Sequence, residues 1–120
     1  MKHVTLLAIE SALASSITIP LEMIHAADVI KRIRNRKAER RSFLIASEQG
    51  QPLTMIGGIV IAPQASLADI PRTDLIFIPA LWGNPNAIVS AHPGITEWLA
   101  AQYALGATIC SVGTGRFCLW

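Results

Sequence analysis

The stretch Ala107-Thr-Ile-Cys-Ser-Val-Gly-Thr-Gly-Arg-Phe117 decides the fold expected for this chain of 120 residues. A short apolar run enters a Gly-Thr-Gly turn, and the residues that follow are predicted to begin a helix. This order is typical of a nucleophile elbow, the strained strand-to-helix turn that raises one reactive side chain above a parallel sheet. Gly113 occupies the apex, where a nucleophilic Cys or Ser is expected. The sequence therefore predicts the architecture of a catalytic site without its reactive atom.

Upstream of the elbow, short apolar runs alternate with longer amphipathic segments, which is the pattern of strand, crossover helix and strand. We expect strands at residues 4–9, 42–47, 75–78 and 108–112, helices at 17–34 and 95–105, and a two-residue hairpin turn at Gly57-Gly58 within 53–62. Ser16 or Thr18 is expected to cap the first helix, with Pro20 in its first turn, and Gly106 to end the second.

Composition agrees with one α/β domain. Hydrophobic residues make up 52% of the chain and charged residues only 15%, against about 25% charged in an average soluble domain. This shortage of charge indicates strands buried on both faces, as in a mainly parallel sheet between two helical layers. The sequence therefore predicts a three-layer α/β sandwich.

Several features bear on location and cofactors. Glu10 interrupts the N-terminal apolar run, which argues against a signal peptide, and no uncharged apolar run approaches the ~18 residues of a membrane span. Two Cys without disulfide-like spacing fit a reducing cytoplasm. The three His and two Cys lack a metal-ligand spacing. We therefore expect a cytoplasmic protein with no membrane contact, no metal and no cofactor.

Three parts of the chain resemble the sensor domain of AraC-type transcriptional regulators, in the PfpI-like branch of the class I glutamine amidotransferase superfamily. They are residues 3–9 with 19–27, residues 47–52 with 58–69, and residues 73–79 leading to the elbow. The resemblance covers nearly all of residues 1–120 and implies a flavodoxin-like domain that is incomplete at its C-terminus. It also implies a homodimer, which would contact DNA only through a C-terminal helix-turn-helix domain absent from this sequence.

The same resemblance assigns the catalytic positions. The family's elbow usually reads Ser-Val-Cys-Thr-Gly, which places its Cys on Gly113, and its carboxylate matches Ser16. The family's His either matches Arg116 or has no identifiable counterpart in this sequence. These departures imply a non-catalytic ligand-sensing or dimerisation domain rather than an enzyme. The alternative is a PfpI-like cysteine hydrolase, amidase or deglycase, which would need another nucleophile. Cys110 and Cys118 are interpreted as packing residues.

A pocket at the elbow is the candidate binding site. Gly113 leaves room above the turn, and the N–H groups of Thr114, Gly115 and Arg116 would point into it with the positive end of a helix dipole. Ser16 would lie beside this pocket, with Trp82 and Asn84 as walls. A small anionic or carboxylated effector would suit such a pocket. An empty, vestigial pocket is the alternative.

Residues 31–41 form a basic run that holds seven of the ten Lys and Arg residues. Such a run is typical of a nucleic-acid or anionic-surface patch. Cations late in a helix also complement its C-terminal dipole and solvate the loop that follows, and this second interpretation is favoured. The run contains no aromatic residue and the net charge is only +2. We therefore expect no sequence-specific DNA binding by this domain.

Overall fold

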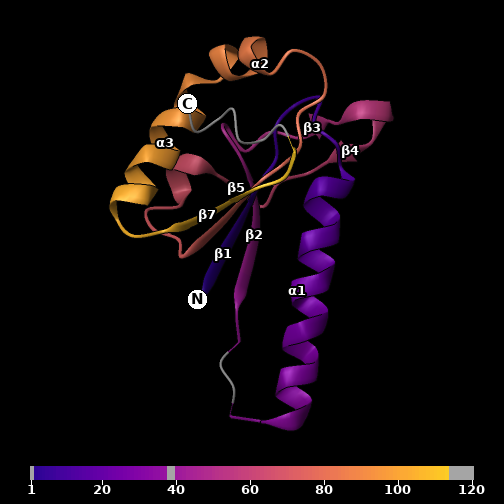
Figure 1. Cartoon of the computed structure of the whole chain (residues 1–120), viewed down its shortest axis with the longest axis vertical. Coiled ribbons are helices and arrows are strands. Elements are labelled where there is room, and N and C mark those ends of the chain that lie inside the picture. Colours follow the sequence, from indigo (N-terminus) through magenta and orange to yellow (C-terminus); the bar gives the residue numbers. More distant parts are fainter. Residues whose placement is uncertain (1, 38–39, 114–120) are drawn as a thin grey trace.

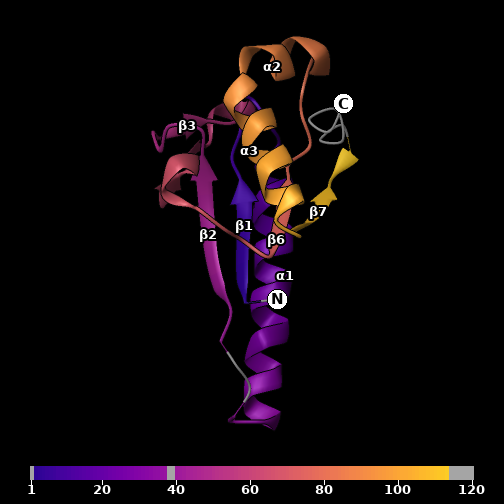
Figure 2. The same ribbon diagram turned by 90° about the vertical axis from the view of Figure 1, so that its left-hand side faces the viewer.

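A parallel β-sheet lies between helices in the computed structural model, which describes residues 2–37 and 40–113 (Figure 1). The strand order is β5-β2-β1-β6-β7. Helix α1 (Ser15–Arg34) covers one face of the sheet, and α3 (Pro93–Ala104) covers the other, preceded by α2 (Pro85–Ala91) (Figures 1 and 2). The strands are β1 (His3–Leu7), β2 (Ser42–Ser47), β5 (Ala65–Ser66), β6 (Leu75–Ile78) and β7 (Thr108–Ser111). The predicted three-layer α/β architecture is confirmed.

The core centres on β1, which pairs in parallel with β2 on one side and with β6 on the other. Residues Val4 to Leu7 are all buried, although side chains along a strand alternate between its two faces. A parallel sheet requires this, because the crossover helices cover both faces. Ile17 of α1 and Leu99 of α3 are buried in the same core. The apolar character of the short runs follows from this two-sided burial.

A buried polar network ties α3 to the amino-terminal edge of the sheet. Thr5 Oγ1 donates to Thr73 Oγ1 at 2.9 Å, and the Thr73 backbone N–H donates to Gln102 Oε1 at 3.0 Å. Gln102 Nε2 donates to the Pro71 carbonyl at 3.1 Å, and Gln102 itself is only 3% exposed. Each bond satisfies a group that would otherwise lose water without replacement.

Asp74 closes the same edge. Its carboxylate accepts from the backbone N–H groups of His3, at 2.8 Å, and Lys2, at 3.0 Å. The bond from His3 is the largest cause that lowers the pKa of Asp74 below its ordinary value of 3.8. The Asp74 backbone also accepts from Thr108 N, at 2.9 Å, so one residue joins β1, β6 and β7.

The start of α1 differs from the prediction. The helix begins at Ser15, its N-cap is Ala14, and no side chain caps it, so the predicted cap by Ser16 or Thr18 is wrong. Ser16 lies inside the first turn, where its hydroxyl donates to the Leu13 carbonyl at 2.6 Å. Because the helix begins earlier than expected, Pro20 lies in its second turn.

The predicted hairpin forms from β3 (Leu53–Thr54) and β4 (Val60–Ile61). Its connection is longer than the expected two-residue turn, because a short 3-10 turn at Ile56–Gly58 lies between the strands. Gly57 and Gly58 have φ of 82° and 87°, values that favour glycine. The β5 strand and α2 were not predicted. Asn84-Pro85 gave a helix-start signal for α2 that the sequence analysis did not use.

Helix α1 is much longer than the strand it follows. Twenty helical residues span about 30 Å, whereas the five residues of β1 span about 17 Å. The second half of α1 therefore projects past the amino-terminal edge of the sheet (Figure 1). Within the described residues, no helix combines the length and apolarity needed to cross a membrane.

Candidate functional site

The candidate site lies where the order of the sheet reverses direction, between β1 and β6. In open α/β sheets the crevice beyond the carboxyl ends of such strands is the usual binding position. The loops after these two strands are joined here: Leu13 N donates to the Ala80 carbonyl at 3.0 Å, and Ala12 forms an antiparallel bridge with Leu81. The loop after β1 is thereby fixed against the loop after β6.

Ser16 and Gly113 meet at Ala80 from different elements. Ser16 Oγ accepts from the Ala80 backbone N–H at 2.9 Å. Gly113 follows β7 with a φ of +53°, and a Cβ added there would lie 3.5 Å from Ala80 Cβ. Positive φ is the strained backbone expected at an elbow apex. The structure therefore brings the two positions that the resemblance assigned to one catalytic site to the same residue.

The chemistry available at this point is limited. Gly113 offers no nucleophile, and Ser16 is only 8% exposed. The Ser16 hydroxyl donates to Leu13 and accepts from Ala80, so it holds two loops together. It is not free to hold a proton for a neighbouring thiol. Cys110 lies three residues before the apex, half-buried within β7.

The remaining predicted pocket residues are not brought together by the described contacts. Thr114, Gly115 and Arg116 lie outside the described residues, as does Cys118. Asn84 caps α2: its Oδ1 accepts from the backbone N–H groups of residues 86 and 87, at 3.0 and 3.4 Å. Trp82 is 58% exposed. The anion pocket with these walls stays a prediction.

A crevice lies at the carboxyl ends of β1 and β2. Its volume is about 310 Å³. The polar residues that line it are Glu10, Ser47, Glu48, Gln49, Gln51 and His92. Two carboxylates here disfavour an anionic ligand. No group of three or more His, Cys, Asp or Glu side chains in the described part of the chain could hold a metal ion.

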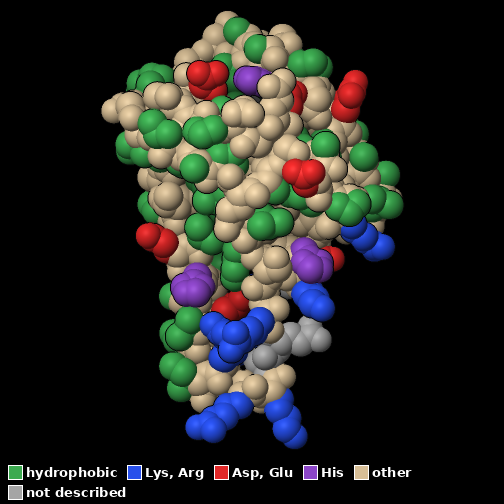
Figure 3. Space-filling model, turned by 180° about the vertical axis from the view of Figure 1, so that it is seen from behind, with side chains coloured by type: hydrophobic (Ala, Val, Ile, Leu, Met, Phe, Trp, Pro, Cys, Tyr) green, Lys and Arg blue, Asp and Glu red, His purple; other side chains and the backbone are tan. Residues whose placement is uncertain are grey.

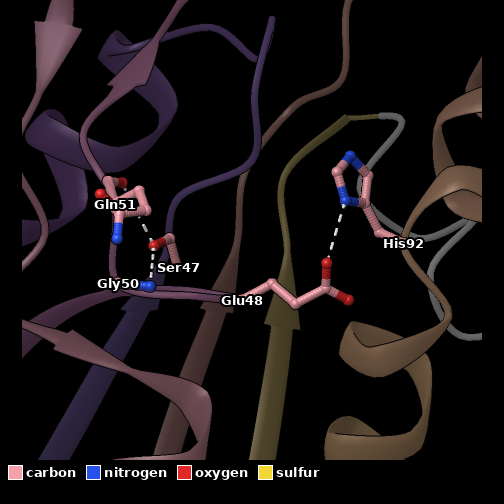
Figure 4. Close-up of polar contacts among 5 residues, drawn as sticks. All are labelled: Ser47, Glu48, Gly50, Gln51 and His92. Carbon is pink, nitrogen blue, oxygen red and sulfur yellow. Dashed lines mark hydrogen bonds and ion pairs between the residues drawn. The ribbon is translucent and has the colours of Figure 1, made fainter.

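Glu48 and His92 face each other across this crevice (Figure 4). Glu48 Oε1 lies 3.5 Å from His92 Nδ1. A Cβ on Gly94 would lie only 2.5 Å from Glu48 Oε2, so the carboxylate rests against the first turn of α3. That helix has no side-chain cap of its own, and a negative charge at its N-terminus is favourable. Glu48 thereby connects the end of β2 to the α2–α3 junction.

A tight turn after β2 positions Glu48. The Gly50 backbone N–H donates to Ser47 Oγ at 2.9 Å, and Ser47 Oγ donates to the Gln51 carbonyl at 3.4 Å (Figure 4). Gly50 has a φ of 77°, and a Cβ there would lie 3.3 Å from Ser66 Cβ. Residues 47–52 resembled a family motif, but their sequence predicted no role for Glu48. Its His92 partner is 44 residues away, so local sequence carried no signal for the contact.

Comparisons with known proteins give matches in structure only: no family model and no curated protein matches this sequence. A protein of Vibrio parahaemolyticus assigned to the transcriptional regulators is similar over 98% of this chain, with a TM-score of 0.83 and 22% identity. An AraC family transcriptional regulator from Pseudomonas putida is similar over 99%, with a TM-score of 0.77 and 18% identity. A ThiJ/PfpI family protein from Pseudomonas syringae is similar over 98%, with a TM-score of 0.77 and 18% identity.

These likenesses define the class of fold: a flavodoxin-like α/β domain of the kind found in ThiJ/PfpI and DJ-1 proteins. Solved members of this structural group include an AraC family transcriptional regulator. The chain spans 59% of the Vibrio protein, 69% of the Pseudomonas putida regulator and 44% of the Pseudomonas syringae protein.

Proposed function

We propose that this chain is the non-catalytic ligand-sensing or dimerisation domain of an AraC-type transcriptional regulator of the cytoplasm. The observation that carries the proposal is the elbow at Gly113. Its left-handed backbone is retained, while the reactive side chain is missing and Ser16 is engaged in fixing two loops. An enzyme of this fold would need both positions for chemistry, whereas a regulator needs only the shape. The regulators among the structural neighbours support this choice.

A stripe of exposed apolar side chains on α1 supports dimerisation. Ile19, Met23, Ile30 and Ile33 are 52 to 76% exposed, and Ala26 is also exposed between them. Steps of four and three residues alternate along this stripe, which is the spacing of a seam between two paired helices. The opposite face of α1 packs against the rest of the chain: Ile17 lies in the core, and Asp28 is buried.

The partner proposed for the stripe is a second copy of this chain. Residues 31–41 contain seven cations and one anion, so the remaining chain holds three cations and seven anions. A parallel pair of α1 helices would bring two strongly basic ends together. An antiparallel pair would separate them by about the length of the helix, roughly 30 Å, and would therefore weaken the repulsion between the two basic ends.

The association is tested by sedimentation equilibrium. Residues 1–120 should form a dimer at micromolar concentration, and Ile30→Lys should make it a monomer. Tyr103→Lys is the matched control, because Tyr103 is 71% exposed on α3, away from the stripe. A monomeric wild-type chain, or equal effects of the two variants, would contradict dimerisation through α1.

The absence of catalysis is tested separately, with peptide, ester and glyoxal substrates. No thiol-dependent turnover is expected. Turnover that disappears in Cys110→Ala would show that the chain uses a nucleophile other than the elbow residue, and would favour the hydrolase or deglycase alternative.

A further inference from the structure

We infer that the projecting end of α1, together with the described residues of the loop after it, forms a surface that binds the phosphate backbone of duplex DNA without reading its sequence. The surface, here named the basic tip, consists of five exposed cations: Lys31, Arg34, Arg36, Lys37 and Arg40. This inference rests on the proposed function, because a regulator's domain would be held close to DNA by the rest of the protein.

The first observation is the separation of charge along the molecule. Residues 31–41 carry a net charge of +6 and the rest of the chain carries −4, although the net charge of the whole is only +2. Figure 3 shows Lys and Arg side chains gathered at the lower end of the molecule, whereas Asp and Glu side chains lie mostly over the upper body. A polyanion would therefore be attracted to one end and repelled by the other.

The second observation is the way the tip is presented. Helix termination and loop solvation explain why cations occur after residue 30, but they do not require α1 to extend past the sheet. The overhang carries these cations away from the acidic body, to one end of the molecule (Figures 1 and 3). In one copy of the chain, a rod-like polyanion can approach this end without meeting the carboxylates of the same copy's body.

Two further arginines in this region are half-buried and contact Asp28. Arg41 Nε lies 3.5 Å from Asp28 Oδ1, and Arg32 Nε donates to the Asp28 backbone carbonyl at 3.4 Å. Asp28 is 7% exposed, so this contact lies beneath the tip. The side chains of Arg32 and Arg41 therefore shape the surface, and the five exposed cations are the ones available to phosphates.

The composition of the tip favours a duplex over a single strand. Residues 31–41 contain no aromatic side chain on which an unpaired base could stack. Lys and Arg alone supply contacts to phosphates, and such contacts carry no sequence information. Five such contacts predict that the logarithm of the association constant falls with the logarithm of salt concentration with a slope of about −4.5.

The test is an anisotropy titration of labelled 20-base-pair duplexes of two unrelated sequences with residues 1–120, at 50 to 200 mM NaCl. Arg36→Ala/Lys37→Ala should reduce the slope by about 1.8 and weaken binding roughly 60-fold at 0.1 M salt. The matched control is Lys2→Ala/Arg72→Ala, which removes the same charge from exposed positions off the tip and should change binding little. The two duplex sequences should bind equally.

Other outcomes would overturn the inference. They are no duplex binding at 50 mM NaCl, equal losses in the two double variants, a strong preference for one duplex sequence, and tip-dependent binding to phosphatidylserine vesicles without binding to duplex. None of these outcomes changes the result expected from the sedimentation or turnover experiments. If the basic tip does not bind duplex DNA, the proposed regulator function can therefore still be tested separately.

Discussion

Replacing Ser16 with Ala should measure how firmly the candidate site is held together. The substitution removes one oxygen that accepts from the Ala80 N–H at 2.9 Å and donates to the Leu13 carbonyl at 2.6 Å. The loss of this oxygen affects its two hydrogen-bond partners differently. The Leu13 carbonyl still accepts from the Ser16 backbone N–H at 3.1 Å. The Ala80 N–H, in a residue 9% exposed, has no second acceptor among the described residues.

An unsatisfied buried donor costs about 1–3 kcal/mol, so we expect the free energy of unfolding to fall by about 2 kcal/mol. With a urea m-value of about 2 kcal/mol per molar, the midpoint of unfolding should fall by about 1 M. Ser15→Ala is the matched control, because Ser15 is the exposed neighbour in the same helical turn. It should shift stability by less than about 0.5 kcal/mol. Equal midpoints for the two variants would refute the assignment of Ser16 as the link between the loops.

Three further predictions concern other parts of the fold. Gln102→Leu should lower the free energy of unfolding by about 1–3 kcal/mol in urea melts, because the buried Thr73 N–H loses its acceptor; an unchanged midpoint would contradict this. The lowered pKa of Asp74 contributes stability above the ordinary value of 3.8, and that stability is lost as pH falls through the folded pKa. Wild-type stability should therefore fall more steeply than that of Asp74→Asn below that pH, and parallel profiles would argue against it. Gly113→Cys should fold at a cost of about 1–2 kcal/mol for its left-handed backbone. In a Cys-free background its thiol should be alkylated at pH 7 within about tenfold of an exposed Gly57→Cys thiol, because Ser16 occupies the position where the resemblance expects the carboxylate; a much faster reaction would indicate a surviving catalytic environment.

Local patterns were sufficient for most of the sheet. The bounds of β2 and β6 agree with the predicted residues 42–47 and 75–78, because each is a short run bounded by residues that do not continue a strand. The hairpin at Gly57-Gly58 was also predicted correctly, but the longer connection between its strands was not. The length of the turn depends on a backbone hydrogen bond between residues 55 and 59, and the residue types in the turn do not specify such a bond.

Only part of the candidate site could be predicted from the sequence. Motif spacing identified Gly113 and Ser16 as two positions of one site, and the structure brings both to Ala80. Ser16 and Ala80 are 64 residues apart in the chain, and their contact depends on how the two loops that carry them meet. The same is true of Glu48 and His92, whose pairing depends on the junction of α2 and α3. Contacts between residues that are far apart in the chain produce no periodic pattern in the sequence.

The overhang of α1 should give this single helix two different local stabilities. Its first half packs against the sheet, whereas no residue of α1 after Asp28 is buried, and helical turns with little packing open easily in water. Backbone amides of residues 19–24 should therefore exchange with deuterium far more slowly than those of residues 30–34. Any partner that lies along the helix would slow exchange at the later residues, so their amides offer a built-in reporter of occupancy.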